Sequence, residues 1–201
     1  HCYSLLDGKK IWKFNTDKPL IKSQKKLSLI IKENIVIFNN SIGDITAINN
    51  EDGKLIWQTP TQSSKIYGEA MFLNTSDLVL KNSSIIFSNN TNNFFSIDVE
   101  TGVINWKQKI NSSLRPVSID DKILTITNEG YFVVINNDGS ILRSTYLLKN
   151  INNKKRKKIK FTGFALGRKS IYLSSSIGRL FIINISTGKV ENILKIDNDK
   201  I

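Results

Sequence analysis

The feature that most constrains this fold is a short glycine-turn segment that recurs along the chain. Residues 7–13 read DGKKIWK, residues 52–58 read DGKLIWQ, and the third tryptophan has the same place in ETGVINWK at residues 100–107. Two more copies, INNDGSILR at 135–143 and INISTGKVEN at 183–192, keep the turn and lose the tryptophan. The turn glycines are Gly8, Gly53, Gly102, Gly139 and Gly188. Their spacings of 45, 49, 37 and 49 residues indicate a repeated supersecondary unit.

Each copy has the pattern of a β-hairpin. Apolar residues alternate with polar ones before the turn, as at Phe95 and Ile97, and a second alternating run follows the turn. A tight turn needs a residue with positive φ, which glycine adopts without strain. The Asp or Thr before the glycine can hydrogen-bond the turn backbone. We therefore predict five hairpins.

Two further strand-like runs precede each of the last four hairpins. They are KLSLIIK and NIVIFNN, DLVL and SSIIFSN, PVSID and KILTITN, and FTGFALG and SIYLSSS. These runs are short, rich in β-branched residues and without a 3.6-residue period, which indicates an all-β chain. Four strands per unit predict a β-propeller of four-stranded antiparallel blades. We expect one propeller segment, 1–201, with blades at 1–15 (in part), 20–59, 65–110, 114–147 and 161–195.

The three tryptophans have a predicted structural role. Trp12, Trp57 and Trp106 each follow a turn glycine by four residues, which places them on the outermost strand of a blade. A large ring with an N–H group can cover the side of its own blade and pack on the neighbouring blade. We predict that these tryptophans and the five turn glycines dock the blades to one another.

The repeat also resembles a known family. The series AINNEDGKLIW, SIDVETGVINW and IINISTGKVEN is similar to the pyrroloquinoline-quinone-like (PQQ-like) propeller repeat, which ends in acidic-x-x-Thr-Gly-x-x-x-Trp. The resemblance covers nearly the whole chain and implies a closed ring of about eight blades. The chain supplies about four blades and part of a fifth. Because a partial ring would leave bare sheet edges, we expect the chain to be a fragment of the propeller.

One class of protein with this repeat is enzymatic. Quinoprotein dehydrogenases, as the resemblance implies, hold a quinone and calcium with an adjacent cysteine pair, a tryptophan floor and Asp, Glu and Asn side chains. Here Cys2 is the single cysteine, His1 is the single histidine, and every tryptophan has the docking position. Acids such as Asp52 are explained by turn formation. We predict no enzymatic activity and no catalytic, cofactor-binding or metal-binding residue, with a fragment of a PQQ-dependent dehydrogenase as the alternative.

The other class is non-catalytic, and within it the chain is most similar to BamB-like lipoproteins. This resemblance implies a periplasmic scaffold that assists assembly of outer-membrane β-barrel proteins. Its partner would be a barrel-assembly component of the envelope, and a lipid anchor outside this segment would hold it at the outer membrane. The apolar runs are far shorter than the roughly 20 residues that span a bilayer. A generic secreted propeller interaction module is a further alternative.

One candidate partner contact is the connection at residues 59–76, TPTQSSKIYGEAMFLNTS. It is longer than a step between blades requires, and long loops on rigid scaffolds often carry binding sites. We expect Tyr67, Glu69, Met71 and Phe72 to contact a partner. The alternative is a local strand or helical turn that packs Met71 and Phe72 inward.

The second candidate is KNINNKKRKKIK at residues 149–160. Like charges repel, so we expect an extended, solvated loop. Its functional interpretation is attraction to an anionic membrane surface or an acidic partner, carried by Lys154, Lys155, Arg156, Lys157 and Lys158. The net charge of +12 agrees with this interpretation, although the Lys, Asn and Ile usage of an AT-rich genome also explains much of it. Nucleic acid is disfavoured because no aromatic platform interleaves with the basic residues.

Overall fold

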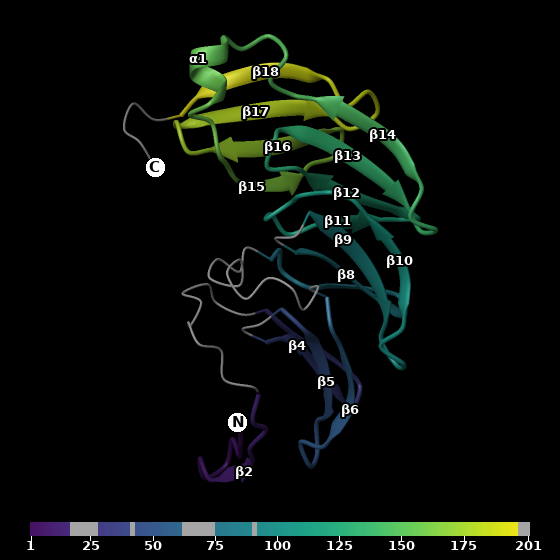
Figure 1. Cartoon of the computed structure of the whole chain (residues 1–201). Helices are drawn as coiled ribbons and strands as arrows, with labels where there is room; N and C mark the ends of the chain where they lie inside the picture. The colour runs from purple at the N-terminus through teal and green to yellow at the C-terminus, as the bar shows by residue number, and fades with distance from the viewer. Residues whose placement is uncertain (17–27, 41–42, 62–74, 90–91, 197–201) are drawn as a thin grey trace. The chain divides into compact units, whose positions relative to one another are not determined.

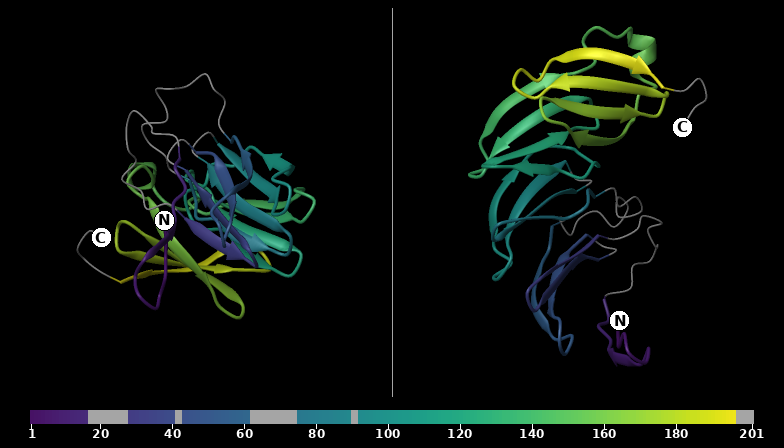
Figure 2. Two further views of the ribbon diagram at one scale, coloured as in Figure 1. Left: turned by 90° about the horizontal axis from the view of Figure 1, so that it is seen from below. Right: turned by 180° about the vertical axis from the view of Figure 1, so that it is seen from behind.

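The computed structural model describes residues 1–16, 28–40, 43–61, 75–89 and 92–196 (Figure 1). These residues divide into two compact units, His1–Lys109 and Ile110–Ile201. Every sheet in the described residues is antiparallel, and its strands lie side by side in chain order (Figures 1 and 2). The prediction of an all-β chain built from four-stranded antiparallel sheets is therefore confirmed.

The first unit holds three sheets. A two-stranded sheet pairs β1 (Cys2–Tyr3) with β2 (Lys10–Trp12). The next contains β3 (Leu29–Lys32), β4 (Ile35–Asn39), β5 (Ile45–Asn49) and β6 (Leu55–Thr59). The third contains β7 (Val79–Lys81), β8 (Ser84–Asn89), β9 (Asn93–Asp98) and β10 (Ile104–Gln108).

The second unit holds two sheets and one short helix. The first sheet contains β11 (Val117–Ile119), β12 (Lys122–Ile126), β13 (Tyr131–Asn136) and β14 (Ile141–Tyr146). The second contains β15 (Phe161–Leu166), β16 (Ser170–Ser175), β17 (Arg179–Asn184) and β18 (Val190–Lys195). The helix, α1 (Asn153–Arg156), lies in the connection between them.

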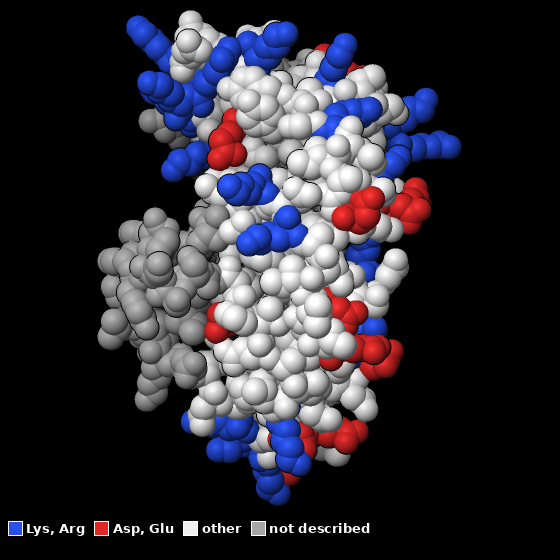
Figure 3. Space-filling model, turned by 45° about the vertical axis from the view of Figure 1, so that its right-hand side comes forward, with Lys and Arg blue, Asp and Glu red and all other residues white. Residues whose placement is uncertain are grey.

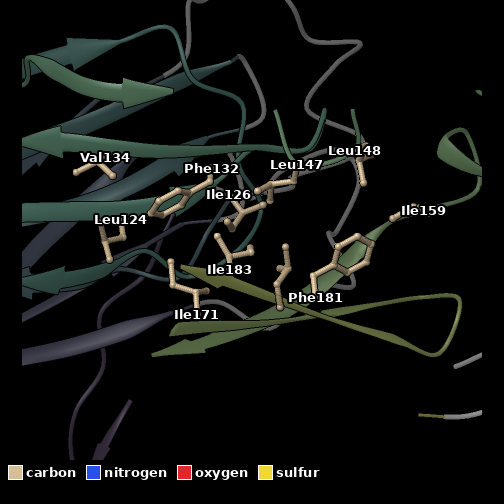
Figure 4. Packing of buried hydrophobic residues seen from close by; sticks show 11 residues of the cluster. Leu124, Ile126, Phe132, Val134, Leu147, Leu148, Ile159, Ile171, Phe181 and Ile183 are labelled. Atoms are coloured by element: carbon tan, nitrogen blue, oxygen red, sulfur yellow. The ribbon is translucent and has the colours of Figure 1, made fainter. Parts of the chain in front are cut away.

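The core of each unit lies between its four-stranded sheets. In the first unit, Ile37, Ala47 and Trp57 share one apolar cluster with Phe87 and Phe95 of the next sheet. In the second unit the corresponding cluster joins the two sheets, and Figure 4 shows residues of β12 and β13 facing residues of β16 and β17. The middle strands carry buried residues at consecutive positions, so both of their faces are covered. The last strand of each sheet is more exposed.

Each hairpin also contains a β-bulge that the sequence pattern did not reveal. In the last strand, one residue is skipped by the pairing register, always three positions after the turn glycine. The skipped residues are Ile11, Ile56, Asn105, Leu142 and Glu191. In β6 the bulge puts Leu55 opposite Ile48 and Trp57 opposite Ala47, so these two residues face opposite sides of the sheet. The bulge thereby turns Trp57 into the core and leaves Leu55 exposed.

The hairpin turns have the conformation that their sequence predicts. All five turn glycines have positive φ, between 67° and 87°. At the third turn the Asp98 side chain accepts hydrogen bonds from the backbone N–H groups of Glu100 and Thr101. A Cβ atom added at Gly102 would lie 2.6 Å from Trp57 Cδ2, so this glycine is needed for space as well as for φ.

We expect Gly102→Ala to lower the free energy of unfolding by more than the roughly 1–2 kcal/mol that a left-handed conformation alone costs, because the new methyl group also displaces the Trp57 ring. Gly8→Ala is the matched control, since Gly8 also has a positive φ, of 67°, and its added Cβ would meet nothing within 4 Å. Urea unfolding of both variants measures the difference. Equal effects of the two substitutions would contradict the close packing at Gly102.

Candidate functional site

One repeated contact joins Trp12 and Trp57 to the turn of the following sheet. Trp57 Nε1 donates a 2.9 Å hydrogen bond to the Val99 carbonyl, and its ring lies against Gly102. Trp12 Nε1 donates a 2.9 Å hydrogen bond to the Asn50 carbonyl, and its ring lies against Gly53. In both cases the acceptor precedes the turn glycine by three residues, so one geometry serves both copies.

Arg143 makes the same contact where the fourth copy lacks tryptophan. It follows Gly139 by four residues, and its Nη1 donates a 3.2 Å hydrogen bond to the Ile185 carbonyl, three residues before Gly188. Its Cδ would lie 3.1 Å from a Cβ added at Gly188. The repeat pattern did not single out Arg143, because the fourth copy lacks tryptophan; its position four residues after the turn glycine is the signal that identifies it. Like the tryptophans, Arg143 supplies an N–H donor for the carbonyl and a flat, partly apolar side chain that lies against the glycine.

Trp106, the third tryptophan, is half-buried and stacks on Phe94 with ring centroids 6.2 Å apart and ring planes 6° apart. Trp57 is the most buried of the three, with 9% of its surface exposed, and it belongs to the first unit's core. We propose that the Trp12, Trp57 and Arg143 contacts dock neighbouring sheets, with their turn glycines as the receiving surface. Under this proposal Trp57 contributes most to stability.

The described stems of the 59–76 loop lie at a polar, largely buried end of the first unit. Tyr67, Glu69, Met71 and Phe72 lie outside the described residues, so their contact role stays a prediction. Both stems of the loop are described. Thr61 accepts a hydrogen bond from the Asn89 side chain through its carbonyl, and Thr75 accepts one from the Asn39 side chain through its hydroxyl, each at 2.9 Å.

These anchoring residues occupy one end of the two sheets. Asn39 ends β4 and Asn89 ends β8, and both are at most 1% exposed. Ser28 joins the same group, because its N–H donates to Asn39 Oδ1 and its hydroxyl accepts from the Leu78 N–H. Buried polar groups are stable only when they are hydrogen-bonded. We call this end, formed by Ser28, Asn39, Thr61, Thr75 and Asn89, the loop platform.

The basic segment at 149–160 is folded, so the expectation of an extended loop is wrong. Asn152 caps α1 by accepting a hydrogen bond from the Lys154 N–H. Arg156 Nε donates to the Ile151 carbonyl and Arg156 Nη2 to the Lys149 carbonyl, which closes the turn. The Arg156 guanidinium also lies 5.7 Å from the centroid of the Tyr146 ring. Internal hydrogen bonds with carbonyl oxygens outweigh the repulsion between lysines here.

The side chains of this segment therefore divide into two kinds. Lys154, Lys155, Lys157 and Lys158 are exposed, whereas Arg156 is half-buried and Ile159 is buried. Arg156 maintains the fold of the turn, and the four lysines face solvent. Of the five basic residues predicted to contact a partner, these four are the ones free to do so.

Two further findings concern cofactors and membranes. Within the described residues, no group of three or more His, Cys, Asp or Glu side chains is placed to hold a metal ion. The same part of the chain contains no helix of the length and apolarity that a bilayer crossing requires.

Comparison with known proteins assigns the family. The family model described as outer membrane protein assembly factor BamB matches residues 2–145. The chain belongs to the BamB family. Membership agrees with the PQQ-like repeat seen in the sequence. No curated protein sequence matches the chain significantly.

Solved structures show the propeller fold that a BamB-family chain should have. The crystal structure of BamB from Moraxella catarrhalis matches with a TM-score of 0.72 and 15% identity, covering 94% of this chain and 55% of that one. The computationally designed Ika8 protein matches with a TM-score of 0.64 and 13% identity, covering 96% and 54%. The β-propeller domain of Cps50 (Swd1) from Myceliophteria thermophila matches with a TM-score of 0.65 and 10% identity, covering 86% and 55%. The chain thus spans about half the length of these structures, and the β-propeller fold is confirmed.

We expect Trp57→Ala to reduce the free energy of unfolding by roughly 3–5 kcal/mol, as large-to-small changes of buried aromatic residues do. Trp57→Phe keeps an aromatic ring but removes the hydrogen bond to Val99 and part of the ring surface that packs on Gly102, so its effect should be about 1–3 kcal/mol and smaller than that of Trp57→Ala. The loss of stability caused by Trp12→Ala, at a half-buried position, should lie between those of the two Trp57 variants. Chemical denaturation of the three variants gives this order, and a cost for Trp12→Ala equal to that of Trp57→Ala would contradict it.

Stability should fall in acid through the turn carboxylates. The Thr101 backbone N–H and hydroxyl donate to Asp98 and hold the pKa of its carboxyl below the ordinary value. The folded state then binds fewer protons than the unfolded state near the unfolded pKa of about 3.9. The stabilisation is therefore present above that pH and is lost as the pH falls through the folded pKa. Asp98→Asn should be less stable than the unsubstituted protein at neutral pH and approach it in acid.

Thermal melts of both proteins between about pH 7 and pH 2 measure this convergence. Thr101→Val is the companion variant, because it removes one donor to Asp98 and leaves the carboxylate in place. It should show a smaller change in the same direction. Melting temperatures that fall in parallel for all three proteins would show that Asp98 does not contribute.

Proposed function

We propose that this protein is a non-enzymatic interaction scaffold that assists assembly of outer-membrane β-barrel proteins. The observation that carries the proposal is the match of the BamB family model to residues 2–145. The role places the protein in the periplasm, associated with the outer membrane through a lipid anchor outside residues 1–201. Its partner is a barrel-assembly protein of the envelope.

The mechanism follows from the loop platform. The stems of the 59–76 loop are fixed by buried hydrogen bonds between Asn39 and Thr75 and between Asn89 and Thr61. A connection with immobilised ends has fewer conformations to lose when a partner binds. Tyr67 and Phe72 are the proposed anchors of such a contact, because aromatic side chains carry much of the binding energy in protein interfaces.

Docking on loops is favoured over addition of a partner strand to the last strand of a sheet. β6, β10, β14 and β18 each contain a bulge near the turn. A bulge bends and twists a strand and disrupts the ladder that a partner strand would have to extend. The loop end is therefore the surface on which a partner contact is expected.

The enzymatic alternative has less support from the residues that the structure describes. The quinone environment calls for a cysteine pair and a tryptophan floor, whereas Cys2 is the single cysteine and all three tryptophans lie on last strands. Trp12 and Trp57 are already engaged with turn glycines. The residues present do not fit a quinone site.

The test is site-specific photocrosslinking in the native cell envelope. Benzoylphenylalanine is placed at position 67 or 72 in the full-length protein, and products are identified by mass spectrometry. The matched control positions are Glu51 and Glu100, which are exposed in hairpin turns. We expect positions 67 and 72 to capture an outer-membrane barrel-assembly protein and the control positions to capture none.

Two results would contradict the proposal. Capture of the same protein from the hairpin-turn positions alone would place the contact at the other end of the sheets. Absence of any envelope partner, together with calcium and a quinone chromophore in the purified full-length protein, would favour the dehydrogenase alternative.

A further inference from the structure

The positive charge of this chain is concentrated in one part of it. Residues 110–201 carry 16 Lys and Arg against 7 Asp and Glu, a net charge of +9 out of +12, whereas residues 1–109 carry +3. Residues 139–190 contain twelve Lys and Arg and no acidic residue. A bias in codon usage would affect both units alike, so it does not explain this difference.

The second unit gathers part of this charge at one end of its last sheet. The Ser176 N–H donates to the Lys160 carbonyl at 2.8 Å, and the Lys160 N–H donates to Ser176 Oγ at 3.1 Å. These bonds attach the connection that follows α1 to the turn between β16 and β17. The Ile196 N–H donates to the Gly178 carbonyl at 2.9 Å, so the end of β18 closes on the same turn. Figures 1 and 2 show α1 at this end of the last sheet. Figure 3 shows Lys and Arg side chains gathered in the upper part of the molecule, which is the part where Figure 1 places α1.

The strand register adds two more cations to this end. Arg179 of β17 pairs directly with Lys195 of β18, and Ser175 pairs with Arg179 in the same row. Like charges directly opposite each other in a sheet are destabilising. We define the basic face as Lys154, Lys155, Lys157, Lys158, Lys160, Arg179 and Lys195. The Arg179–Lys195 pair is a cost to folding that an external anion would offset.

We propose that the basic face binds the phosphate headgroups of anionic phospholipids and holds this end of the protein against a membrane surface. Six of its seven cations are lysines, which act as point charges and suit attraction to a charged plane better than bidentate recognition of one group. Arg156, the group best suited to bidentate recognition, is engaged by carbonyl oxygens of its own turn.

The surroundings of the face favour lipid over nucleic acid. Among the described residues of the α1 turn, the β16–β17 turn and the end of β18, no exposed aromatic side chain offers a platform for stacking bases.

The test is co-sedimentation of the full-length protein with vesicles. One set contains phosphatidylcholine alone, and the other contains about one third phosphatidylglycerol. We expect binding only to the anionic vesicles, with loss as sodium chloride rises from about 0.05 to 0.5 M, since salt screens the attraction.

The decisive comparison uses two variants that lose the same number of charges. One carries Lys154→Gln, Lys155→Gln, Lys157→Gln and Lys158→Gln, and leaves Arg156 in place so that the turn stays folded. The control carries Lys10→Gln, Lys13→Gln, Lys107→Gln and Lys109→Gln, four exposed lysines of the first unit. The first variant should lose more than tenfold in vesicle partitioning, because each lysine near the surface contributes roughly fivefold. The control should stay within about twofold.

Three results would overturn the proposal. Equal losses in the two variants would show that net charge alone is responsible. Equal binding to both kinds of vesicle would exclude a role for anionic headgroups. Duplex DNA that binds more tightly than the anionic vesicles, through the same four lysines, would assign the face to nucleic acid. Purified lipids suffice for these experiments, so their outcome is independent of the proposed assembly role.

Discussion

The hydrogen bond from one hairpin to the carbonyl of the next turn is the interaction on which, in our proposal, the sheet arrangement within each unit depends. Its donor always follows a turn glycine by four residues, and its acceptor always precedes the next turn glycine by three. A glycine is required beside it because a Cβ atom would occupy the space of the ring. The bulge is required as well, since without it the donor would share a face with the exposed residue two positions before it. Turn, bulge and donor thus form one unit, and each depends on the other two.

Polar groups are distributed unequally between the two ends of the sheets. At the hairpin end, half-buried Asp and Asn side chains satisfy the turn backbone, as Asp98 and Asn49 do. At the opposite end of the first unit, Asn39 and Asn89 are buried and bind the stems of the long loop. Leaving such a group without a partner costs about 1–3 kcal/mol. Local turns therefore need only short-range partners, whereas the loop platform depends on residues far apart in the sequence.

This distinction explains what the sequence could and could not predict. The strands and hairpins were predictable because their signals are local: alternation, β-branched residues and a glycine at a positive-φ position. The pairing of Asn39 with Thr75 was not, because it joins residues 36 positions apart that have no recognisable motif. The bulge was hidden since an extra residue in one strand leaves no mark on the apolar pattern of that strand alone. The α1 turn was misjudged because charge repulsion was weighed without the carbonyl oxygens that Arg156 binds.

The equivalence of Arg143 with tryptophan bears on how such repeats evolve and are recognised. The contact needs a donor N–H and a flat surface at one position, and two chemically different side chains supply both. A repeat can therefore diverge beyond the reach of a tryptophan-based signature while its contact geometry persists. The family model ends at residue 145, yet the sheet of β15–β18 beyond it receives the Arg143 hydrogen bond as the earlier sheets receive those of tryptophan. Counting tryptophans would underestimate the number of repeats in a lineage whose structure had not changed.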